Sequence, residues 1–274
     1  MGHGIAQVAA VAGYTVALID TGEDRVAAGL ARIRENLDGA VQRGKITTEA
    51  RDGALARIEP TIDLAAGVRE AVLVIEAVPE RIALKQAVFQ QVDAYASDEA
   101  VVATNTSSLS VTDLQRGTAH GARVLGLHFF NPVHINRLVE VIRGRDTSEH
   151  VLERALAFVR RIEKEPVVVN DSPGFATSRL GVLLGLEAMR MVEEGVASAH
   201  DIDRAMELGY RHPMGPLKLT DLVGLDVRLD IAMYLHEKLG TDQFQPPAIL
   251  RDMVAAGKLG RKSGEGFYRW DDDA

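Results

Sequence analysis

The sequence contains no cysteine among its 274 residues. Disulfide bonds, thiolate nucleophiles and cysteine-ligated metals are therefore excluded, and a reducing cytoplasm is the expected compartment. Long apolar runs are also lacking, because none approaches the roughly 20 residues that a membrane-spanning helix needs. The N-terminus has no basic region followed by a cleavage site, so we expect no signal peptide and no membrane attachment.

Basic residues are in the minority, with 31 Lys and Arg against 39 Asp and Glu and a formal net charge of −8. A nucleic-acid-binding protein needs a basic surface to neutralise phosphates, so we expect no nucleic-acid partner. A small polyanionic ligand stays compatible with this charge, because a few local Lys and Arg side chains are enough to bind it. The eight histidines show neither a cysteine partner nor an H-E-x-x-H spacing, so no metal is expected.

Short apolar runs alternate with helical patterns through the first part of the chain. Residues 4–13 predict a helix that ends at Gly13, residues 14–20 predict a strand, and residues 25–45 have helical spacing. Further strands are expected over residues 71–78, 100–108, 123–130, 138–142 and 166–171, with a helix over 84–92. This alternation predicts an α/β fold with a mostly parallel sheet that is covered on both faces.

The strand pattern ends near residues 170–174, which read Asn-Asp-Ser-Pro-Gly. Beyond them, helices are predicted over residues 179–194, 202–208 and 224–239. We therefore expect two domains, an α/β domain over residues 1–168 and an all-helical domain over residues 169–274.

An acidic residue follows the first predicted helix and strand. Asp20 lies 18 residues after Gly2, and in dinucleotide-binding units an acid about 20 residues past the glycine fingerprint binds the ribose 2′-hydroxyl of NAD. An acid there repels a 2′-phosphate, so this interpretation favours NAD over NADP. The alternative, that Asp20 only begins the Thr21-Gly22 turn, stays open on spacing alone.

The front of this dinucleotide-binding unit is incomplete. Gly2 can supply only the last glycine of G-x-G-x-x-G, and neither the first two glycines nor the strand before them is in the sequence. That strand is normally the central one of a doubly wound, Rossmann-like sheet. We expect that the chain begins at an internal Met and that the natural protein starts about ten residues earlier.

Polar side chains stand in or directly after three of the predicted strands. His128 lies at the end of an apolar run, where an α/β sheet places its ligand, and is a candidate general base. Glu140 lies within an apolar run, where an unpaired carboxylate is costly, so His128 is an attractive partner for it. Asn105 and Ser107 could polarise a carbonyl or bind a carboxamide. Each of these residues also has a structural alternative. His128 is alternatively a strand histidine bonded to backbone, and Glu140 an exposed residue of an edge strand. Asn105 and Ser107 alternatively belong to a helix cap before Leu109.

Together with these residues, nine segments resemble the 3-hydroxyacyl-CoA dehydrogenase family, in particular its bacterial 3-hydroxybutyryl-CoA branch. They occur in the family's order along nearly the whole chain: MGHGIAQVAA, VIEAVPE, TNTSSLSVTDL, GLHFFNPV, LVEVI, DSPGF, HDIDRAM, GYRHPMGPLKLTDLVGLD and GRKSGEGFY. The resemblance implies a Rossmann-like NAD-binding domain, followed by a helical domain that binds substrate and forms a homodimer. It also implies that the chain oxidises an (S)-3-hydroxyacyl-CoA to the 3-ketoacyl-CoA, with NAD accepting the hydride.

The resemblance also assigns individual residues. His128 matches the catalytic base and Glu140 its carboxylate partner, while Ser107 and Asn131 match residues that contact substrate and nicotinamide. The remaining matches are cofactor positions, Gly2, Asp20, Glu80, Lys85, Asn105 and Lys262, and, loosely, the basic residues Arg43 and Lys45 for the CoA phosphates.

One departure from the family concerns the segment after Pro-Gly-Phe. The family often has Asn where this chain has Ser178, a shorter side chain that can still donate a hydrogen bond. The acyl preference is therefore open, and 3-hydroxyadipyl-CoA or a sugar acid are alternative substrates. A further alternative is a non-catalytic dimeric chain that cannot bind NAD because its first strand is missing.

Overall fold

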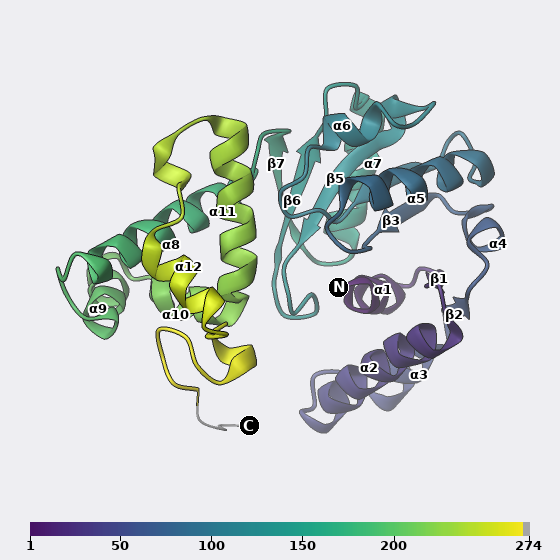
Figure 1. Cartoon of the computed structure of the whole chain (residues 1–274). Helices are drawn as coiled ribbons and strands as arrows, with labels where there is room; N and C mark the ends of the chain where they lie inside the picture. Colours follow the sequence, from purple (N-terminus) through teal and green to yellow (C-terminus); the bar gives the residue numbers. More distant parts are fainter. Residues whose placement is uncertain (271–274) are drawn as a thin grey trace. The chain divides into compact units, whose positions relative to one another are not determined.

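The computed structural model describes residues 1–270, which divide into two compact units, Met1–Ser172 and the residues from Pro173 onward. The first unit holds all the named strands and the second is built from helices (Figure 1). The division falls after Ser172 rather than after residue 168, because strand β7 (Glu165–Asn170) belongs to the first unit and ends just before it.

The first three predicted elements are present. They are α1 (Gly2–Val11), β1 (Val16–Ile19) and α2 (Glu23–Gln42). Gly13 joins α1 to β1 with a φ of +96°, a left-handed conformation that favours glycine. The stretch that follows contains three elements that the sequence pattern did not predict, α3 (Thr48–Ala56), β2 (Ile58–Thr61) and α4 (Leu64–Val68). Strand β2 was missed because its four residues include Glu59 and Pro60 and carry no apolar run.

The larger sheet has five strands in the order β3-β4-β5-β6-β7. Its other members are β3 (Leu73–Glu76), β4 (Val101–Thr104), β5 (Val124–Phe129) and β6 (Leu138–Arg143). Neighbouring strands run parallel except β5 and β6, which are antiparallel. All residues of β4 and β5 are buried, as expected for the centre of a sheet that is covered on both faces.

Helices cover both faces of this sheet. On one face, Ile5 and Ala9 of α1 share an apolar cluster with Leu127 of β5 and Val159 of α7 (Glu149–Arg161). On the other face lie α5 (Ile82–Tyr95) and α6 (Val111–Gln115). A Cβ atom at Gly126 would lie 3.1 Å from Val111, so glycine in β5 lets α6 approach closely.

Strands β1 and β2 form a separate parallel pair, and within residues 1–270 no strand joins β1 to β3. Helix α1 connects the two sheets, because Ala6 and Ala10 pack with Ile33 and Leu37 of α2 while its other side packs on the larger sheet. All of β1 and most of β3 are only half-buried, unlike β4.

The second unit contains α8 (Thr177–Glu193), α9 (Ala199–Tyr210), α10 (Pro216–Val223), α11 (Leu225–Leu239) and α12 (Ala248–Ala255). Ser198 caps α9 by accepting a hydrogen bond from the Asp201 amide at 3.1 Å. The last described turn is held by Asp221, which is buried and accepts hydrogen bonds from the Phe267 and Tyr268 amides. None of the helices described within residues 1–270 is long and apolar enough to cross a bilayer.

Candidate active site

The central feature of the first unit is a histidine–glutamate pair across the β5–β6 ladder. His128 and Glu140 are direct register partners on these antiparallel strands, so their side chains emerge on the same face. Nδ1 of His128 lies 2.8 Å from Oε2 of Glu140. Their exposed fractions are 5% and 0%, which makes this a desolvated pair in which the carboxylate has a strong influence on the imidazole.

The geometry of the pair selects one tautomer of the imidazole. An ionised carboxylate only accepts hydrogen bonds, so Nδ1 of His128 carries a proton and donates it to Glu140. In the neutral ring, the lone pair that can take up a proton then belongs to Nε2. The negative charge of the Glu140 carboxylate, next to Nδ1, stabilises the imidazolium that forms when Nε2 takes up a proton. The arrangement can therefore perform general base catalysis.

Asn105 links the ends of two strands beside this pair. Its backbone amide donates to the Glu76 carbonyl at 2.7 Å, and its side-chain Oδ1 accepts a hydrogen bond from the Phe129 amide at 2.9 Å. Phe129 follows His128 directly, so Asn105 holds the end of β4 against the end of β5. The structure thus places Asn105 next to the histidine.

A buried charged network lies beneath the loop after β4. Lys85 and Glu76 have side chains that are each 1% exposed, and Nζ of Lys85 lies 2.9 Å and 3.1 Å from the two carboxylate oxygens of Glu76. Glu76 also accepts hydrogen bonds from Thr104 Oγ1 and the Val78 amide. Every one of these contacts offsets the cost of burying two charges.

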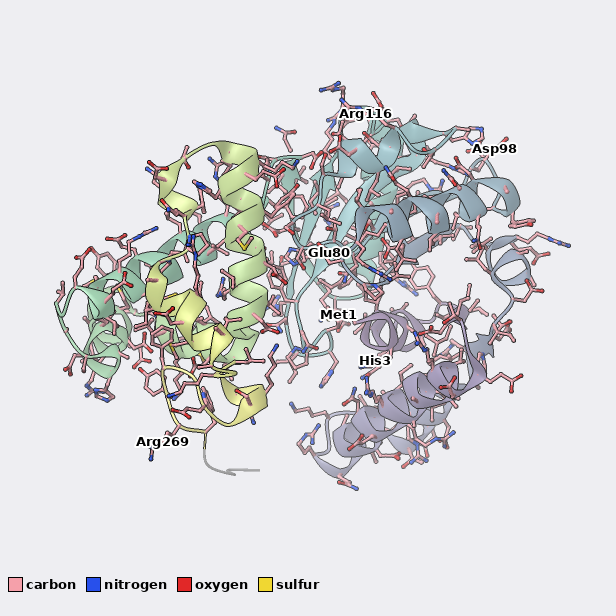
Figure 2. All side chains as sticks on the ribbon, viewed as in Figure 1. Met1, His3, Glu80, Asp98, Arg116 and Arg269 are labelled. Carbon is pink, nitrogen blue, oxygen red and sulfur yellow. The ribbon has the colours of Figure 1, made fainter. Side chains whose placement is uncertain are left out.

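Glu80, which Figure 2 labels, connects this network to the loop that carries Ser107. Its Oε2 lies 3.3 Å from Lys85 Nζ, and its Oε1 accepts hydrogen bonds from Thr106 Oγ1 and from the Ser107 and Ser108 amides. Glu80 therefore holds the loop that carries Ser107 in position, and Lys85 in turn holds Glu80. Their direct contact with NAD stays a prediction.

The loop after His128 is held by a second buried lysine. Nζ of Lys164 donates to the carbonyls of Val133 and Asn136, at 2.5 Å and 2.6 Å. Asn131 lies at the exposed start of this loop, directly beyond the strand that carries His128. Burial lowers the pKa of Lys164. Asn131 thus belongs to a loop close to His128 in sequence that the buried Lys164 side chain holds in place.

Arg43 and Lys45 act electrostatically on this same loop. The pKa of His134 is lowered by burial and then by the positive charges of Lys164, Arg43 and Lys45. Arg43 caps the C-terminal end of α2 and is exposed, as is Lys45. The sequence analysis treated these two residues as a loose match for the CoA phosphates, and that assignment stays a prediction; the structure shows that their charges act on His134.

The predicted cofactor residues Gly2 and Asp20 come from the N-terminal elements. Gly2 begins α1, and a Cβ atom there would lie 3.7 Å from Ala77, just beyond the end of β3. Asp20 follows the end of β1, and its Oδ1 accepts a hydrogen bond from the Thr21 amide at 2.7 Å. Both residues thus lie at the carboxyl ends of parallel strands, where open α/β sheets bind nucleotides.

Two predicted site residues, Ser178 and Lys262, belong to the second unit. Ser178 lies in the first turn of α8. Lys262 forms an ion pair with Asp226, at 2.6 Å from its Oδ2. This pair, together with backbone hydrogen bonds, outweighs the effect of burial and lowers the pKa of Asp226. Their predicted contacts with substrate and cofactor stay predictions.

Sequence reasoning missed three residues that shape the site, Glu76, Lys164 and His134. Glu76 carried a usable signal, because it lies within the apolar run 71–78, as Glu140 lies within its own run. Lys164 and His134 carried none, since their contacts come from distant elements. In the part of the chain that the structure describes, no group of three or more metal-binding side chains is assembled.

Comparison with known proteins identifies the family. The NAD-binding domain of 3-hydroxyacyl-CoA dehydrogenase matches residues 1–172, and the C-terminal domain of the same enzyme matches residues 174–270. Among curated relatives, the probable 3-hydroxybutyryl-CoA dehydrogenase of Deinococcus radiodurans is 42% identical over 98% of this chain and 96% of that protein. The mitochondrial hydroxyacyl-coenzyme A dehydrogenase of Rattus norvegicus is 41% identical over 98% of this chain and 88% of that protein.

Solved structures agree with this result. The (S)-3-hydroxybutyryl-CoA dehydrogenase of Ralstonia eutropha superposes with a TM-score of 0.96 at 38% identity, covering 99% of this chain and 96% of that one. The match spans both units and includes the buried histidine–glutamate pair within its range. The chain therefore belongs to the 3-hydroxyacyl-CoA dehydrogenase family of NAD-dependent oxidoreductases.

Proposed function

We propose that this chain interconverts a short (S)-3-hydroxyacyl-CoA, of the 3-hydroxybutyryl-CoA type, and its 3-ketoacyl-CoA, with His128 as general base. The observation that supports this most directly is the buried contact of 2.8 Å between His128 and Glu140 across the β5–β6 ladder. A desolvated imidazole with a carboxylate at Nδ1 is suited to take a proton from a hydroxyl group.

In the oxidation, Nε2 of His128 takes the proton of the 3-hydroxyl group while the hydrogen on C3 leaves as hydride. NAD, when bound, supplies the acceptor for that hydride. Glu140 stabilises the imidazolium, and Ser107 and Asn131 orient the substrate oxygen and the nicotinamide. The reverse reaction returns the proton from His128 to the ketone oxygen.

The residues present fit the cofactor. Asp20 offers a carboxylate at the end of β1 for a ribose diol, and the first turn of α1 directs backbone N–H groups towards the carboxyl ends of the strands. We assign Asp20 and Gly2 to NAD on this basis, with Asn105, Glu80, Lys85 and Lys262 as further cofactor positions. Arg43 and Lys45 are assigned to the CoA phosphates.

The direct test is oxidation of NADH by the purified chain with acetoacetyl-CoA, followed at 340 nm. Turnover supports the proposal, and comparison of kcat/KM with a 3-keto sugar acid separates the acyl-CoA from a non-CoA substrate. NADH titration tests the cofactor assignment separately, because absence of binding by the folded chain would contradict it.

Replacement of Glu140 tests the pair. We expect Glu140→Gln to lower kcat/KM by about 100-fold, because a neutral amide no longer stabilises the imidazolium and can hold the ring in the wrong tautomer. The measurement is steady-state NADH oxidation, with Glu140→Asp as the control that keeps the charge. Retention of more than a third of wild-type activity in Glu140→Gln would contradict the assigned role.

We further propose that the chain works in the cytoplasm as a homodimer formed through the second unit. Support for the dimer comes from large apolar side chains of that unit that are exposed in the single chain, among them Leu180, Leu208 and Tyr210, which are 68%, 68% and 77% exposed. Sedimentation equilibrium tests it, since a monomeric mass at micromolar concentration would overturn the proposal.

A further inference from the structure

One buried cation of the first unit is bound only to backbone carbonyls. Lys164, between α7 and β7, is 8% exposed and donates to the carbonyls of Val133 and Asn136 in the β5–β6 loop, residues 130–137. In the described part of the chain it forms no ion pair with a carboxylate. A buried ammonium without a counter-charge costs free energy that an apolar side chain of the same length does not. Stability alone therefore does not explain this lysine.

The backbone after α7 turns this lysine inward. Glu163 has a φ of +58°, a left-handed conformation that ends the helix. The Lys164 amide then donates back to the Val159 carbonyl at 3.0 Å, and the Glu165 amide donates to the Arg137 carbonyl at 2.8 Å. Side chain and backbone of this turn thus hold the second half of the β5–β6 loop.

The first half of the same loop contacts the imidazole of His128. The ring of Phe130 lies with its centroid 4.4 Å from that of His128, at an interplanar angle of 45°. Val133 is buried against α1, where a Cβ atom at Gly4 would lie 3.0 Å from it. The loop therefore has an apolar anchor in Val133 and a charged anchor in Lys164, and its first residue touches the candidate base.

We propose that Lys164 is a positioning residue for the reaction, because its ammonium fixes the β5–β6 loop and thereby keeps Phe130 against the imidazole of His128. This inference rests on the proposed function, which makes His128 the base. Hydrogen bonds from an ammonium are roughly twice as strong as those from a neutral amine. Loss of the proton from Lys164 therefore loosens the loop while Val133 stays in the core. The rate is affected most, since a shift of about 1 Å in a reacting group can cost about 100-fold.

The charge on Lys164 depends on pH in a useful range. Burial lowers the pKa of Lys164, so it loses its proton at a lower pH than an exposed lysine does. The other charged or titratable groups around the lysine and the loop are at least partly exposed, and none of them pairs with it: His3, Arg32, Arg43, Lys45, His134, Arg137, Glu163 and Glu165.

The test is the pH profile of kcat for oxidation of (S)-3-hydroxybutyryl-CoA at saturating NAD. We expect kcat to rise from low pH as His128 loses its proton, and to fall again at alkaline pH as Lys164 loses its own. In Lys164→Met we expect kcat to be about 30-fold lower at the optimum and the alkaline limb to be absent, while KM changes less than about threefold. Lys164→Arg keeps its charge throughout, so its alkaline limb should move to higher pH.

The matched control is Lys258→Met. Lys258 is a partly exposed lysine of the second unit that pairs with Glu265 at 2.7 Å. Its replacement should leave both kcat and the alkaline limb unchanged. A wild-type alkaline limb in Lys164→Met would overturn the role of Lys164. If Lys164→Met does not fold, Lys164→Arg decides, because an unchanged alkaline limb in that variant overturns the proposal.

Hydrogen exchange gives a readout that does not need turnover. The amides of Ile135 and Asn136 both donate to the Pro132 carbonyl, at 3.1 Å and 3.0 Å, so their exchange reports whether the loop stays in place. We expect both amides to exchange at least about tenfold faster in folded Lys164→Met than in the wild type. Unchanged exchange would overturn the proposal, whereas faster exchange in a chain whose wild type shows no turnover would count against the proposed function instead.

Discussion

We expect His128→Gln to lower kcat/KM for NADH-dependent reduction of acetoacetyl-CoA by about 1,000-fold, while the dissociation constant of NADH changes little. Glutamine has nearly the size of histidine and hydrogen-bonding groups, but its amide cannot take or return a proton near neutral pH. The proposed proton transfer between substrate and Nε2 is therefore lost, whereas most of the residues that we assign to NAD belong to other elements. Stopped-flow reduction and NADH fluorescence titration measure the two quantities.

The matched control for this variant is His120→Gln. His120 also belongs to the first unit but is about half exposed and lies near the carboxylates of Asp93 and Asp98 on the surface. Its replacement should leave kcat/KM within about twofold, as expected for a surface substitution. Near-normal turnover in His128→Gln would refute its assignment as general base, and a large loss of NADH affinity would reassign it to cofactor binding.

The second large effect is on stability. We expect Lys85→Met to lower the free energy of unfolding by about 3–5 kcal/mol, because it leaves the carboxylate of Glu76 buried without its cation. Glu76 and Lys85 have side chains that are each only 1% exposed, so water cannot replace the lost partner. Urea unfolding followed by circular dichroism measures the change.

The double variant Glu76→Leu with Lys85→Met separates the pair from its surroundings. It should be more stable than Lys85→Met alone, since no buried charge is left unpaired. Recovery should be incomplete, because Thr104 and the Val78 amide lose the acceptor that Glu76 provides. A decrease below about 1 kcal/mol for Lys85→Met would show that the carboxylate finds another partner or takes up a proton.

Much of the fold could be predicted because the buried strands contain runs of apolar residues in the sequence. The runs 100–108, 123–130 and 138–142 each contain a stretch rich in apolar residues, and these stretches form β4, β5 and β6 at the centre of the sheet. Strand β2 and helix α4 could not be predicted in the same way. Strand β2 has two exposed residues of four and no apolar run, and α4, with the sequence Leu-Ala-Ala-Gly-Val, has only five residues, too few to show helical periodicity.

The site was predictable where a polar residue interrupts an apolar run. Glu140 is such a case, and its pairing with His128 follows from the antiparallel register of β5 and β6. The role of Lys85 could not be read in this way, because a lysine in a helix is normally exposed and only the three-dimensional network turns it inward. Lys164 donates to two carbonyls of a loop that lies 31 and 28 residues away in sequence, and no local sequence pattern indicates such a contact.

The separation of β1 from β3 also bears on how the protein behaves in concentrated solution. Along its side away from β2, β1 presents backbone N–H and C=O groups that no neighbouring strand in residues 1–270 satisfies, and β3 does the same on its side away from β4. Such edges are templates for pairing with strands of other molecules. Charged or proline residues that would discourage this are missing from β1, whose sequence is Val-Ala-Leu-Ile. Among residues 1–270, these two edges are therefore where we expect pairing with strands of other molecules, and additives that discourage intermolecular β-pairing should reduce it.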